Sequence, residues 1–273
     1  MGSEKLSVGA LPTGAFLDGV TVNLPTLAAA TTEAIRRAEF GQGFLLFTLN
    51  LEHFVKVRSI AAFGAIYRRA DLVTADGWPI VWLAARHGVH LERTCGADLV
   101  EPLCRAAAAR GLGVYFIGPG PHAQAEAIAN LRERVDGLRC AGAEAPQIPP
   151  GSDPSILADV DIDGLAARLT ASGARLCFVS LGDPKQGFLA DALAARCPAV
   201  GFVCVGAALD FIAGSALRAP MWVQRVNLEW LWRLMREPRR LAPRYAICAW
   251  VFLGLVVKTA ARRFAAPLSA ATG

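Results

Sequence analysis

Short apolar runs alternate along this chain with segments that have the periodicity of amphipathic helices. Four of the runs have the length of buried strands, and they cover residues 44–48, 113–118, 175–182 and 199–206. Continuous apolar strands separated by helices are typical of a parallel sheet that is covered on both faces. The pattern therefore predicts an α/β fold, Rossmann-like in the broad sense, with a mostly parallel sheet and helices on both faces.

The strand pattern ends near Gly214, and the remainder of the chain has a helical pattern. We therefore expect a core over residues 1–214 and a helical appendage over residues 215–273. Residues 142–154 are rich in Pro and Gly, which predicts a surface loop within the core.

The appendage differs from the core in charge. Residues 218–273 contain ten Lys or Arg and two acidic residues, whereas the whole chain contains 28 and 23. Trp222, Trp230 and Trp232 lie among these arginines. Arginine binds phosphate oxygens, and indole rings favour the headgroup depth of a membrane. The segment therefore favours a membrane surface as partner over the two alternatives, nucleic acid and a merely solvated basic helix.

An apolar run of thirteen residues, 245–257, follows the basic segment. A membrane span needs about 20 apolar residues, so we expect no full span and interpret the run as an interfacial or buried helix. A tilted or re-entrant anchor is the alternative. The N-terminal segment lacks the pattern of a secretory signal, and the seven cysteines include no CxxC pair, which favours a reducing cytoplasm.

Several polar or glycine-rich turns follow the predicted strands, at the edge where parallel sheets bind ligands. Asp76 lies in an Asp-Gly turn, where a carboxylate can act as a general base, although such turns are common without a function. Lys185 and Gln186 could present a charge and an amide to a diphosphate, or begin a solvated helix. Gly118 precedes a predicted helix whose N-terminus could receive phosphate.

Two groups of residues have a weak resemblance to metal sites. Asp159, Asp161 and Asp163 have the spacing of a metal-binding aspartate pair, but they also precede a helical pattern. Aspartate at a helix start stabilises the helix, and we favour this interpretation. His87 and His90 lack a third ligand at suitable spacing, so we expect a surface turn there.

Taken as an ordered set, the turns resemble the WecG/TagA/CpsF family, bacterial glycosyltransferases that extend lipid-linked sugars. The matching segments span about residues 40–244 and are 48–50, 75–77, 93–99, 116–118, 181–186, 205–206, 213–214, 218–220, 228–234 and 237–239. The resemblance implies an inverting hexosyltransferase that needs neither cofactor nor metal. It would move a hexose or N-acetylhexosamine from a UDP-sugar to an undecaprenyl-diphosphate-linked sugar during surface polysaccharide biosynthesis.

The resemblance also implies roles for individual residues. Asp76 matches the family's proposed base, and Thr48 and Asn50 match its neighbouring polar pair, so the catalytic candidates are Asp76 and Thr48. The candidates for substrate binding are Asn50, Gly77, Arg93, Gly118, Gly182, Lys185, Gln186, Gly206, Arg218, Glu229, Arg233, Arg239, Arg240 and Arg244. Among these, Arg233, Arg239, Arg240 and Arg244 are our candidates for neutralising the UDP leaving group.

The implied location is the cytoplasmic face of the bacterial inner membrane, with a membrane surface and no nucleic acid as partner. The sequence leaves open whether the protein forms a homo-oligomer. One departure from the family matters, because Gly187 stands where the family usually has Glu after Pro-Lys-Gln. This absence is the only support in the sequence for an alternative function, a catalytically inactive membrane scaffold of a polysaccharide assembly complex.

Overall fold

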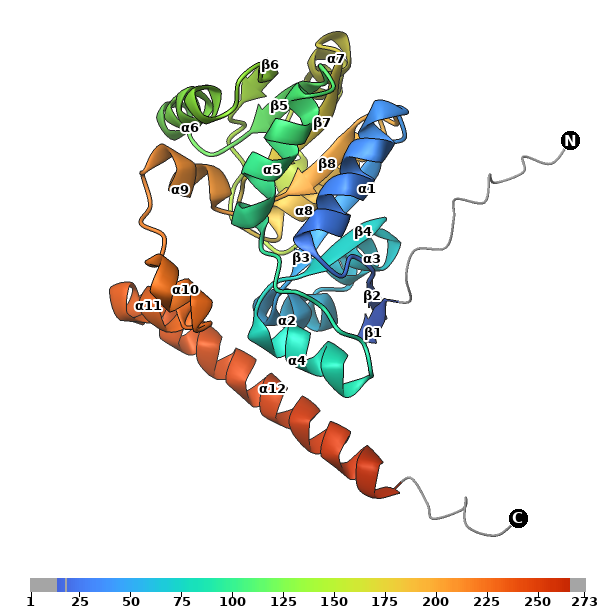
Figure 1. Ribbon diagram of the computed structural model, residues 1–273, viewed down its shortest axis with the longest axis vertical. Helices are drawn as coiled ribbons and strands as arrows, with labels where there is room; N and C mark the ends of the chain where they lie inside the picture. The colour runs from blue at the N-terminus through green and yellow to red at the C-terminus, as the bar shows by residue number, and fades with distance from the viewer. Residues whose placement is uncertain (1–13, 18, 266–273) are drawn as a thin grey trace, which may run out of the picture.

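The computed structural model describes residues 14–17 and 19–265. Its centre is a six-stranded sheet with the order β4-β3-β8-β7-β5-β6, in which every pairing is parallel (Figure 1). The strands are β3 (Phe44–Leu49), β4 (Leu72–Ala75), β5 (Gly113–Ile117), β6 (Arg139–Glu144), β7 (Ala174–Val179) and β8 (Gly201–Cys204). The predicted α/β fold is therefore confirmed, and the four predicted strands all lie in the sheet.

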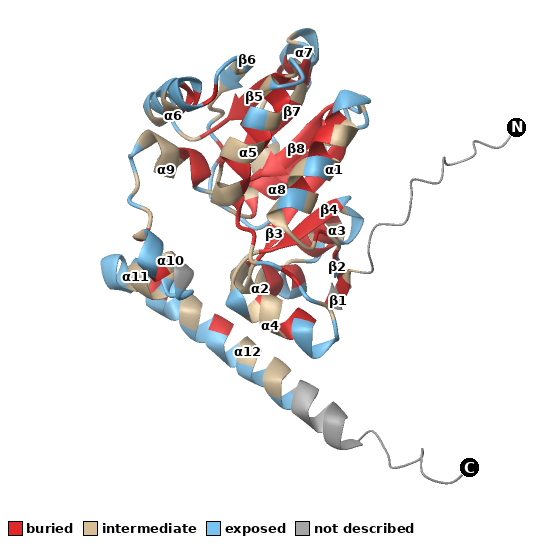
Figure 2. Cartoon of the chain, viewed as in Figure 1, coloured by how far each residue is buried: buried red, intermediate tan, exposed pale blue. Residues whose placement is uncertain are grey.

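Side chains alternate along each strand and divide the core into two halves, one on each face of the sheet. In β3, Leu45 and Phe47 pack into one half, and Phe44 and Leu46 into the other. Helices cover both faces and leave the central strands buried, as predicted (Figure 2). One face carries α1 (Leu27–Glu39), α5 (Gly96–Ala108), α6 (Pro121–Arg134) and α9 (Ala208–Ala213), and the other carries α3 (Ala61–Arg69), α7 (Ile162–Ala171) and α8 (Lys185–Ala194).

The apolar runs did not reveal every strand. The edge strand β6 has mostly half-exposed side chains, so it lacks an apolar run, and it takes up the first three residues of the loop predicted at 142–154. The later part of that loop leads into a short 3-10 helix (Pro154–Leu157). A small hairpin, β1 (Ala15–Leu17) and β2 (Val20–Val22), precedes the main sheet and is too short to give a pattern.

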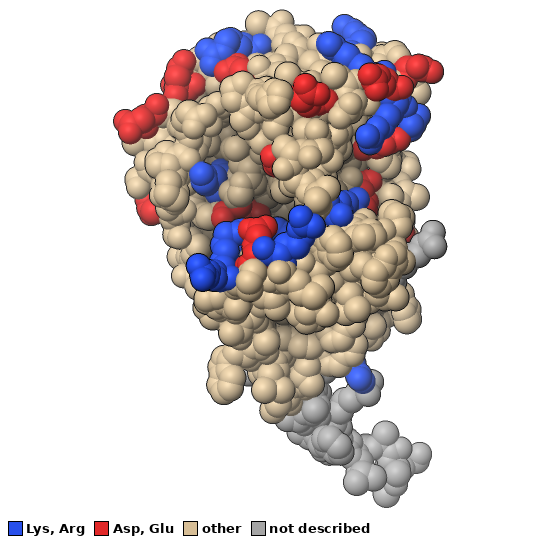
Figure 3. Space-filling view, turned by 90° about the vertical axis from the view of Figure 1, so that its left-hand side faces the viewer, with Lys and Arg blue, Asp and Glu red and all other residues tan. Residues whose placement is uncertain are grey.

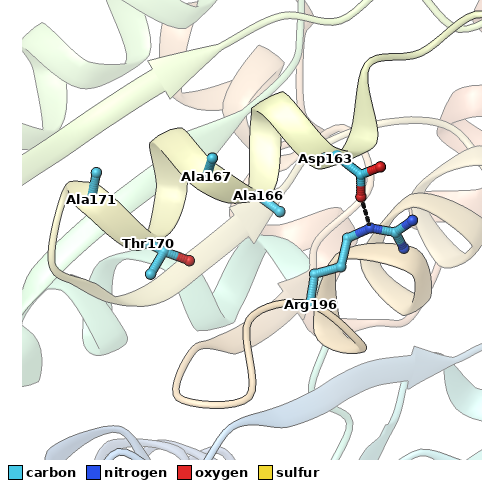
Figure 4. A pocket seen from close by; sticks show the side chains of 6 residues that line it. All are labelled: Asp163, Ala166, Ala167, Thr170, Ala171 and Arg196. Atoms are coloured by element: carbon cyan, nitrogen blue, oxygen red, sulfur yellow. Dashed lines mark hydrogen bonds and ion pairs between the residues drawn. The ribbon is translucent and has the colours of Figure 1, made fainter.

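The aspartates near residue 160 belong to the start of α7. The side chain of Asp161 accepts a hydrogen bond from the backbone N–H of Gly164 at 2.9 Å and so caps the helix. Asp163, in the first turn, forms an ion pair with Arg196 (Figure 4). These two residues and the small side chains of α7 line a shallow surface pocket. The helix-start interpretation is therefore confirmed.

The C-terminal appendage is helical, as predicted. It consists of α10 (Met221–Arg225), α11 (Glu229–Arg236) and α12 (Pro238–Ala265). Helix α12 lies along α2 (Leu51–Ser59) and α4 (Trp78–Arg86), two helices that directly follow β3 and β4 (Figure 1). The appendage is therefore close to the carboxyl edge of the sheet, while the proposed domain boundary at Gly214 stays a prediction.

Helix α12 is longer than the apolar run that predicted it. It continues through Pro243 and includes a window of twenty residues, Pro238–Val257, with a mean hydropathy of 1.4. By length and composition alone this window could cross a membrane, and 11% of it is buried. The helix begins seven residues before the apolar run and is longer than expected, while the expectation that it does not span a membrane stays a prediction.

Candidate active site

Asp76 and Asn50 lie side by side at the carboxyl edge of the sheet. Asn50 follows β3 and Asp76 follows β4, and the Nδ2 group of Asn50 donates a hydrogen bond to Oδ2 of Asp76 at 3.3 Å. The backbone N–H of Asp76 donates to the carbonyl oxygen of Leu49 at 2.8 Å, which continues the ladder between the strands. Asn50 also caps α2 by accepting from the backbone N–H of His53. The structure thus brings the predicted base and its amide neighbour together.

Asp76 is half-buried, and the partial removal of its carboxyl group from water raises its pKa. The charges of His53 and Arg93 and the hydrogen bond from Asn50 oppose this rise without cancelling it. A carboxylate whose pKa is raised binds a proton more strongly than a solvated one, and a general base requires this property. Gly77 follows with φ of 96°, a conformation that favours glycine, and it begins α4.

Four charged side chains form a cluster, here called the charge quartet: Arg93, Asp98, Arg218 and Glu229. Arg218 donates to Asp98 at 2.6 Å and lies 3.7 Å from Glu229, while Arg93 lies 3.5 Å from Asp98 and 4.0 Å from Glu229. Each side chain is about three-quarters buried, with an exposed fraction of 23 to 25%. The quartet ties the appendage to the core, because Arg218 and Glu229 follow the core strands in the chain.

The quartet also interacts electrostatically with Asp76, the predicted base. Burial raises the pKa of Glu229, and Arg218 and Arg93 oppose the rise, whereas Asp76 adds to it. For Asp98, burial favours the neutral form, but hydrogen bonds from Cys95 and Arg218 outweigh it and hold its pKa below the usual value. Arg93 of the quartet lowers the pKa of Asp76, and both guanidinium groups of the quartet are already held by carboxylates.

The arginines of the appendage divide into one docked residue and several exposed ones. Arg244 lies 3.3 Å from the carboxylate of Glu52 on α2. Arg233, Arg239 and Arg240 are exposed, and Arg240 pairs with Glu237 of the appendage. Figure 3 shows a hollow on the face where the appendage begins, with basic and acidic side chains gathered along its rim. Of the four arginines predicted to bind the diphosphate, Arg244 is the one that contacts an acidic side chain of the core.

The turns after β5, β7 and β8 are joined by hydrogen bonds. Gln186 is buried; its Nε2 donates to Asp183 at 2.8 Å, and its Oε1 accepts from the N–H of Gly206 at 2.9 Å. Gly118 has φ of 70°, and a Cβ there would lie 2.5 Å from the carbonyl oxygen of Ser180. Gly182 is exposed at the same edge. Gln186 therefore holds two turns together with both ends of its amide.

Lys185 is not brought to the same place as Gln186. Its Nζ donates to the carbonyl oxygen of Ile148 at 2.8 Å, so the ammonium group holds the loop that follows β6. Thr48 is buried in β3 beside Thr74 of β4. Its carbonyl oxygen accepts from Tyr67 at 3.0 Å and faces Nδ1 of His53 at 2.6 Å, so its backbone supports the site.

Sequence reasoning missed two residues at this edge, His53 and Asp183. The Nε2 atom of His53 lies 2.7 Å from Oδ2 of Asp183, and both side chains are almost fully buried. His53 stands three residues after the helix-capping Asn50, and Asp183 lies inside the turn at 182–186. The sequence held one signal for His53. It is a polar residue on the buried side of α2, a helix that begins at the carboxyl edge of the sheet.

The position of Gly187 faces the core. A Cβ built there would lie 2.9 Å from Cε2 of the Phe63 ring and near Phe47. The ring of Phe63 thus fills the space that a side chain at 187 would need, and a carboxylate there would be buried against aromatic groups. The missing Glu therefore leaves no cavity at this position, and the scaffold alternative stays a prediction.

We expect Gly187→Ala to lower the free energy of unfolding by about 1–3 kcal/mol, the usual cost of overpacking a filled core. Urea unfolding followed by tryptophan fluorescence would measure the change. Gly120→Ala is the control, because Gly120 has an ordinary φ of −65° and no atom within 4 Å of the added Cβ. Equal stability of the two variants would contradict this prediction and show that the ring of Phe63 can move aside without a cost in stability.

Among the residues that the structure describes, no group of three or more His, Cys, Asp or Glu side chains gathers in a way that could hold a metal ion. His87 and His90 are both exposed, at the end of α4 and just beyond it. The side chains that gather at this edge are Asp76, Asn50, the His53–Asp183 pair and the charge quartet.

Such a set, at the carboxyl edge of a Rossmann-like sheet and beneath a basic appendage, fits an enzyme that transfers a group from an anionic donor. A model of the glycosyl transferase WecG/TagA/CpsF family matches residues 15–266, almost the whole chain. The chain therefore belongs to this family of glycosyltransferases, which act in bacterial polysaccharide synthesis. The suspected resemblance is confirmed.

Proposed function

We propose that this protein is an inverting hexosyltransferase that moves a hexose or N-acetylhexosamine from a UDP-sugar to an undecaprenyl-diphosphate-linked sugar. The observation that carries the proposal is the half-buried carboxyl group of Asp76 beside Asn50, with a raised pKa, at the edge where parallel sheets bind ligands. Asp76 takes the proton of the acceptor hydroxyl as its oxygen attacks the anomeric carbon. The bond between that carbon and the UDP oxygen breaks, and the configuration inverts.

The leaving diphosphate needs positive charge, and two groups of arginines support this part of the proposal. Arg93 and Arg218 lie within the charge quartet, already oriented by Asp98 and Glu229, and the charge of Arg93 acts on Asp76. Arg233 lies in the last turn of α11, and Arg239, Arg240 and Arg244 lie in the first part of α12. We assign the diphosphate of the donor first to Arg93 and Arg218, and the lipid phosphates to the exposed arginines.

We propose that the acceptor is met at the cytoplasmic face of the inner membrane, on which α12 lies. The core side of α12 packs against the protein: the ring of Phe252 is 5.1 Å from Trp78 and 5.5 Å from Trp82. Its other side is apolar and exposed, through Ile247, Trp250, Leu253 and Val257. The surface below the hollow carries few charged side chains (Figure 3). An outward apolar stripe on a docked helix suits the acyl boundary of a membrane.

Transfer of radiolabelled sugar to a lipid-diphosphate-sugar acceptor tests the reaction. The donors to compare are UDP-glucose, UDP-N-acetylglucosamine, UDP-N-acetylmannosamine and its uronic acid. We expect one donor to be used, with a rate that EDTA leaves unchanged. Loss of turnover in EDTA would contradict the metal-independent mechanism. Calorimetry with UDP tests the scaffold alternative, because a scaffold has no need of nucleotide affinity.

We expect Trp250→Glu combined with Leu253→Glu to weaken binding to anionic lipid vesicles at least tenfold. Burial of each apolar side chain contributes about 1.5–3 kcal/mol, and the substitutions remove two of them. Both side chains are more than half exposed, so the core is left intact, whereas removal of residues 245–273 would also uncover Trp78 and Trp82.

Vesicle flotation would measure the binding. Phe40→Glu is the matched control. Phe40 is also a large apolar side chain that is 70% exposed, but it lies at the end of α1, outside the C-terminal appendage. If the double variant floats with the vesicles as the wild type does, the arginine segment or the core must hold the protein there instead.

A further inference from the structure

His53 has a hydrogen-bond acceptor at each of its two ring nitrogens. Nδ1 lies 2.6 Å from the carbonyl oxygen of Thr48, and Nε2 lies 2.7 Å from Oδ2 of Asp183. A carbonyl oxygen only accepts, so Nδ1 must carry a proton. Tyr67 also donates to this carbonyl oxygen, at 3.0 Å, and fixes it in place. The charge of the ring therefore depends on the proton between Nε2 and Asp183.

The surroundings of Asp183 favour its ionised form. Oδ2 also accepts a hydrogen bond from Gln186 at 2.8 Å, and Lys56 donates to the backbone oxygen of the same residue at 3.1 Å. His53 and Lys56 together hold the pKa of Asp183 below its usual value despite burial. Burial by itself lowers the pKa of His53, but the carboxylate of Asp183 more than offsets this. His53 and Asp183 therefore form a buried imidazolium–carboxylate pair.

The positive end of this pair is turned towards Asp76. Asn50 stands between them, with its Nδ2 atom 3.3 Å from Oδ2 of Asp76 and 3.5 Å from Nε2 of His53. Its Oδ1 accepts from the backbone N–H of His53, which fixes the orientation of the amide. One amide group thus separates the imidazolium from the carboxylate that is proposed as the base.

We propose that His53 is a positioning residue that holds Asp76 in its ionised, proton-accepting form from behind Asn50. The proposal rests on the proposed function only in naming Asp76 as the base. His53 keeps both of its protons through the reaction, because the proton of the acceptor hydroxyl passes to Asp76. An opposite charge within about 4–6 Å lowers the pKa of a carboxyl group by about one to three units.

Arg93 and the hydrogen bond from Asn50 also lower the pKa of Asp76, but His53 has the largest effect of the three. Beside His53 and Asp76 stand Asp183, Glu52, Tyr67, Arg93, Asp98 and Glu229. The carboxylates of Asp98 and Glu229 are paired with Arg93 and Arg218, so the quartet contains two charges of each sign. Glu52 is paired with Lys56 and Arg244. The positive charge of His53 is paired with Asp183, outside the quartet.

The protonation state of His53 can be measured directly by nitrogen NMR of the full chain in detergent micelles. The chain has four histidines, and His87, His90 and His122 are exposed. We expect both nitrogens of His53 to be protonated at pH 7, because the carboxylate of Asp183 raises the pKa of its ring. His53→Gln assigns the signal. An unprotonated Nε2 at pH 7 would overturn the proposal.

The effect on the base is measured by carbon NMR of the Asp76 carboxyl group, which Asp76→Asn assigns. In His53→Gln we expect the titration midpoint of Asp76 to rise by about one pH unit. The acidic limb of kcat/KM should rise with it, which gives about a tenfold loss on that limb. His87→Gln should change neither. An unmoved midpoint in folded His53→Gln would overturn the proposal.

Two further outcomes keep the proposal separate from the proposed function. If the wild type transfers no sugar, the proposed function fails while both titrations still decide the charge of His53 and its effect on Asp76. If His53→Gln does not fold, Asp183→Asn takes its place. Without its partner carboxylate, His53 should release its proton at least one pH unit lower, and the midpoint of Asp76 should again rise. Unchanged titrations in Asp183→Asn would overturn the proposal.

Discussion

Replacement of Asp76 by Asn is expected to lower kcat of sugar transfer by about 10²–10⁴-fold, the usual contribution of a positioned general base. The amide has the size of the carboxylate and can still accept from Asn50, so the site keeps its shape. It cannot take up a proton from the acceptor hydroxyl at neutral pH. Single-turnover transfer of labelled sugar would measure the loss, and KM for the donor should change little.

Asp163→Asn is the control for this variant. Asp163 is also a carboxylate near a helix start, but it lies on α7, away from the carboxyl edge. Its side chain is exposed and pairs with Arg196. We expect its transfer rate to equal that of the wild type. Equal rates for Asp76→Asn and the wild type would remove Asp76 from the role of base, and UDP affinity would show whether the donor still binds.

The fold could be predicted because its information is local. Four buried strands such as Phe44–Leu49 are continuous apolar runs, since helices cover both faces of the sheet. Strand β6, at the edge, is half-exposed and carries no such run, so it was missed. The full length of α12 was missed for a related reason, because Pro243 and three arginines interrupt the apolar pattern without ending the helix.

The site could be predicted only in part, because its contacts join distant segments. Asp76 and Asn50 each lie at a turn after a strand, and the parallel sheet brings such turns together. His53 and Asp183 are separated by 130 residues, so their pairing becomes visible only when β3 and β7 are placed on either side of β8. The quartet likewise needs Arg218 to return from the appendage to Asp98.

Arg218→Met is expected to lower kcat/KM by about 10²-fold, the cost of losing one donor that stabilises developing negative charge. The substitution keeps an unbranched side chain but removes one of two positive charges from the quartet. Asp98 and Glu229 then share Arg93 alone, so the site carries an excess negative charge where the UDP diphosphate would form. This charge should also raise the pKa of Asp76, and the acidic limb of kcat/KM should move to higher pH.

A second variant separates the two ways in which Arg218 could act. If it acts by balancing charge, Asp98→Asn in the Arg218→Met background restores a neutral quartet and should recover most of the lost rate. If its guanidinium also binds the diphosphate, the double variant stays slow and its affinity for UDP remains weak. Arg240→Met is the matched control, because Arg240 is exposed and pairs with Glu237 within the appendage. Equal losses for Arg218→Met and Arg240→Met would assign the effect to the charge of the appendage as a whole. A larger loss for Arg218→Met places the requirement at the quartet, where the guanidinium group of Arg218 lies between Asp98 and Glu229.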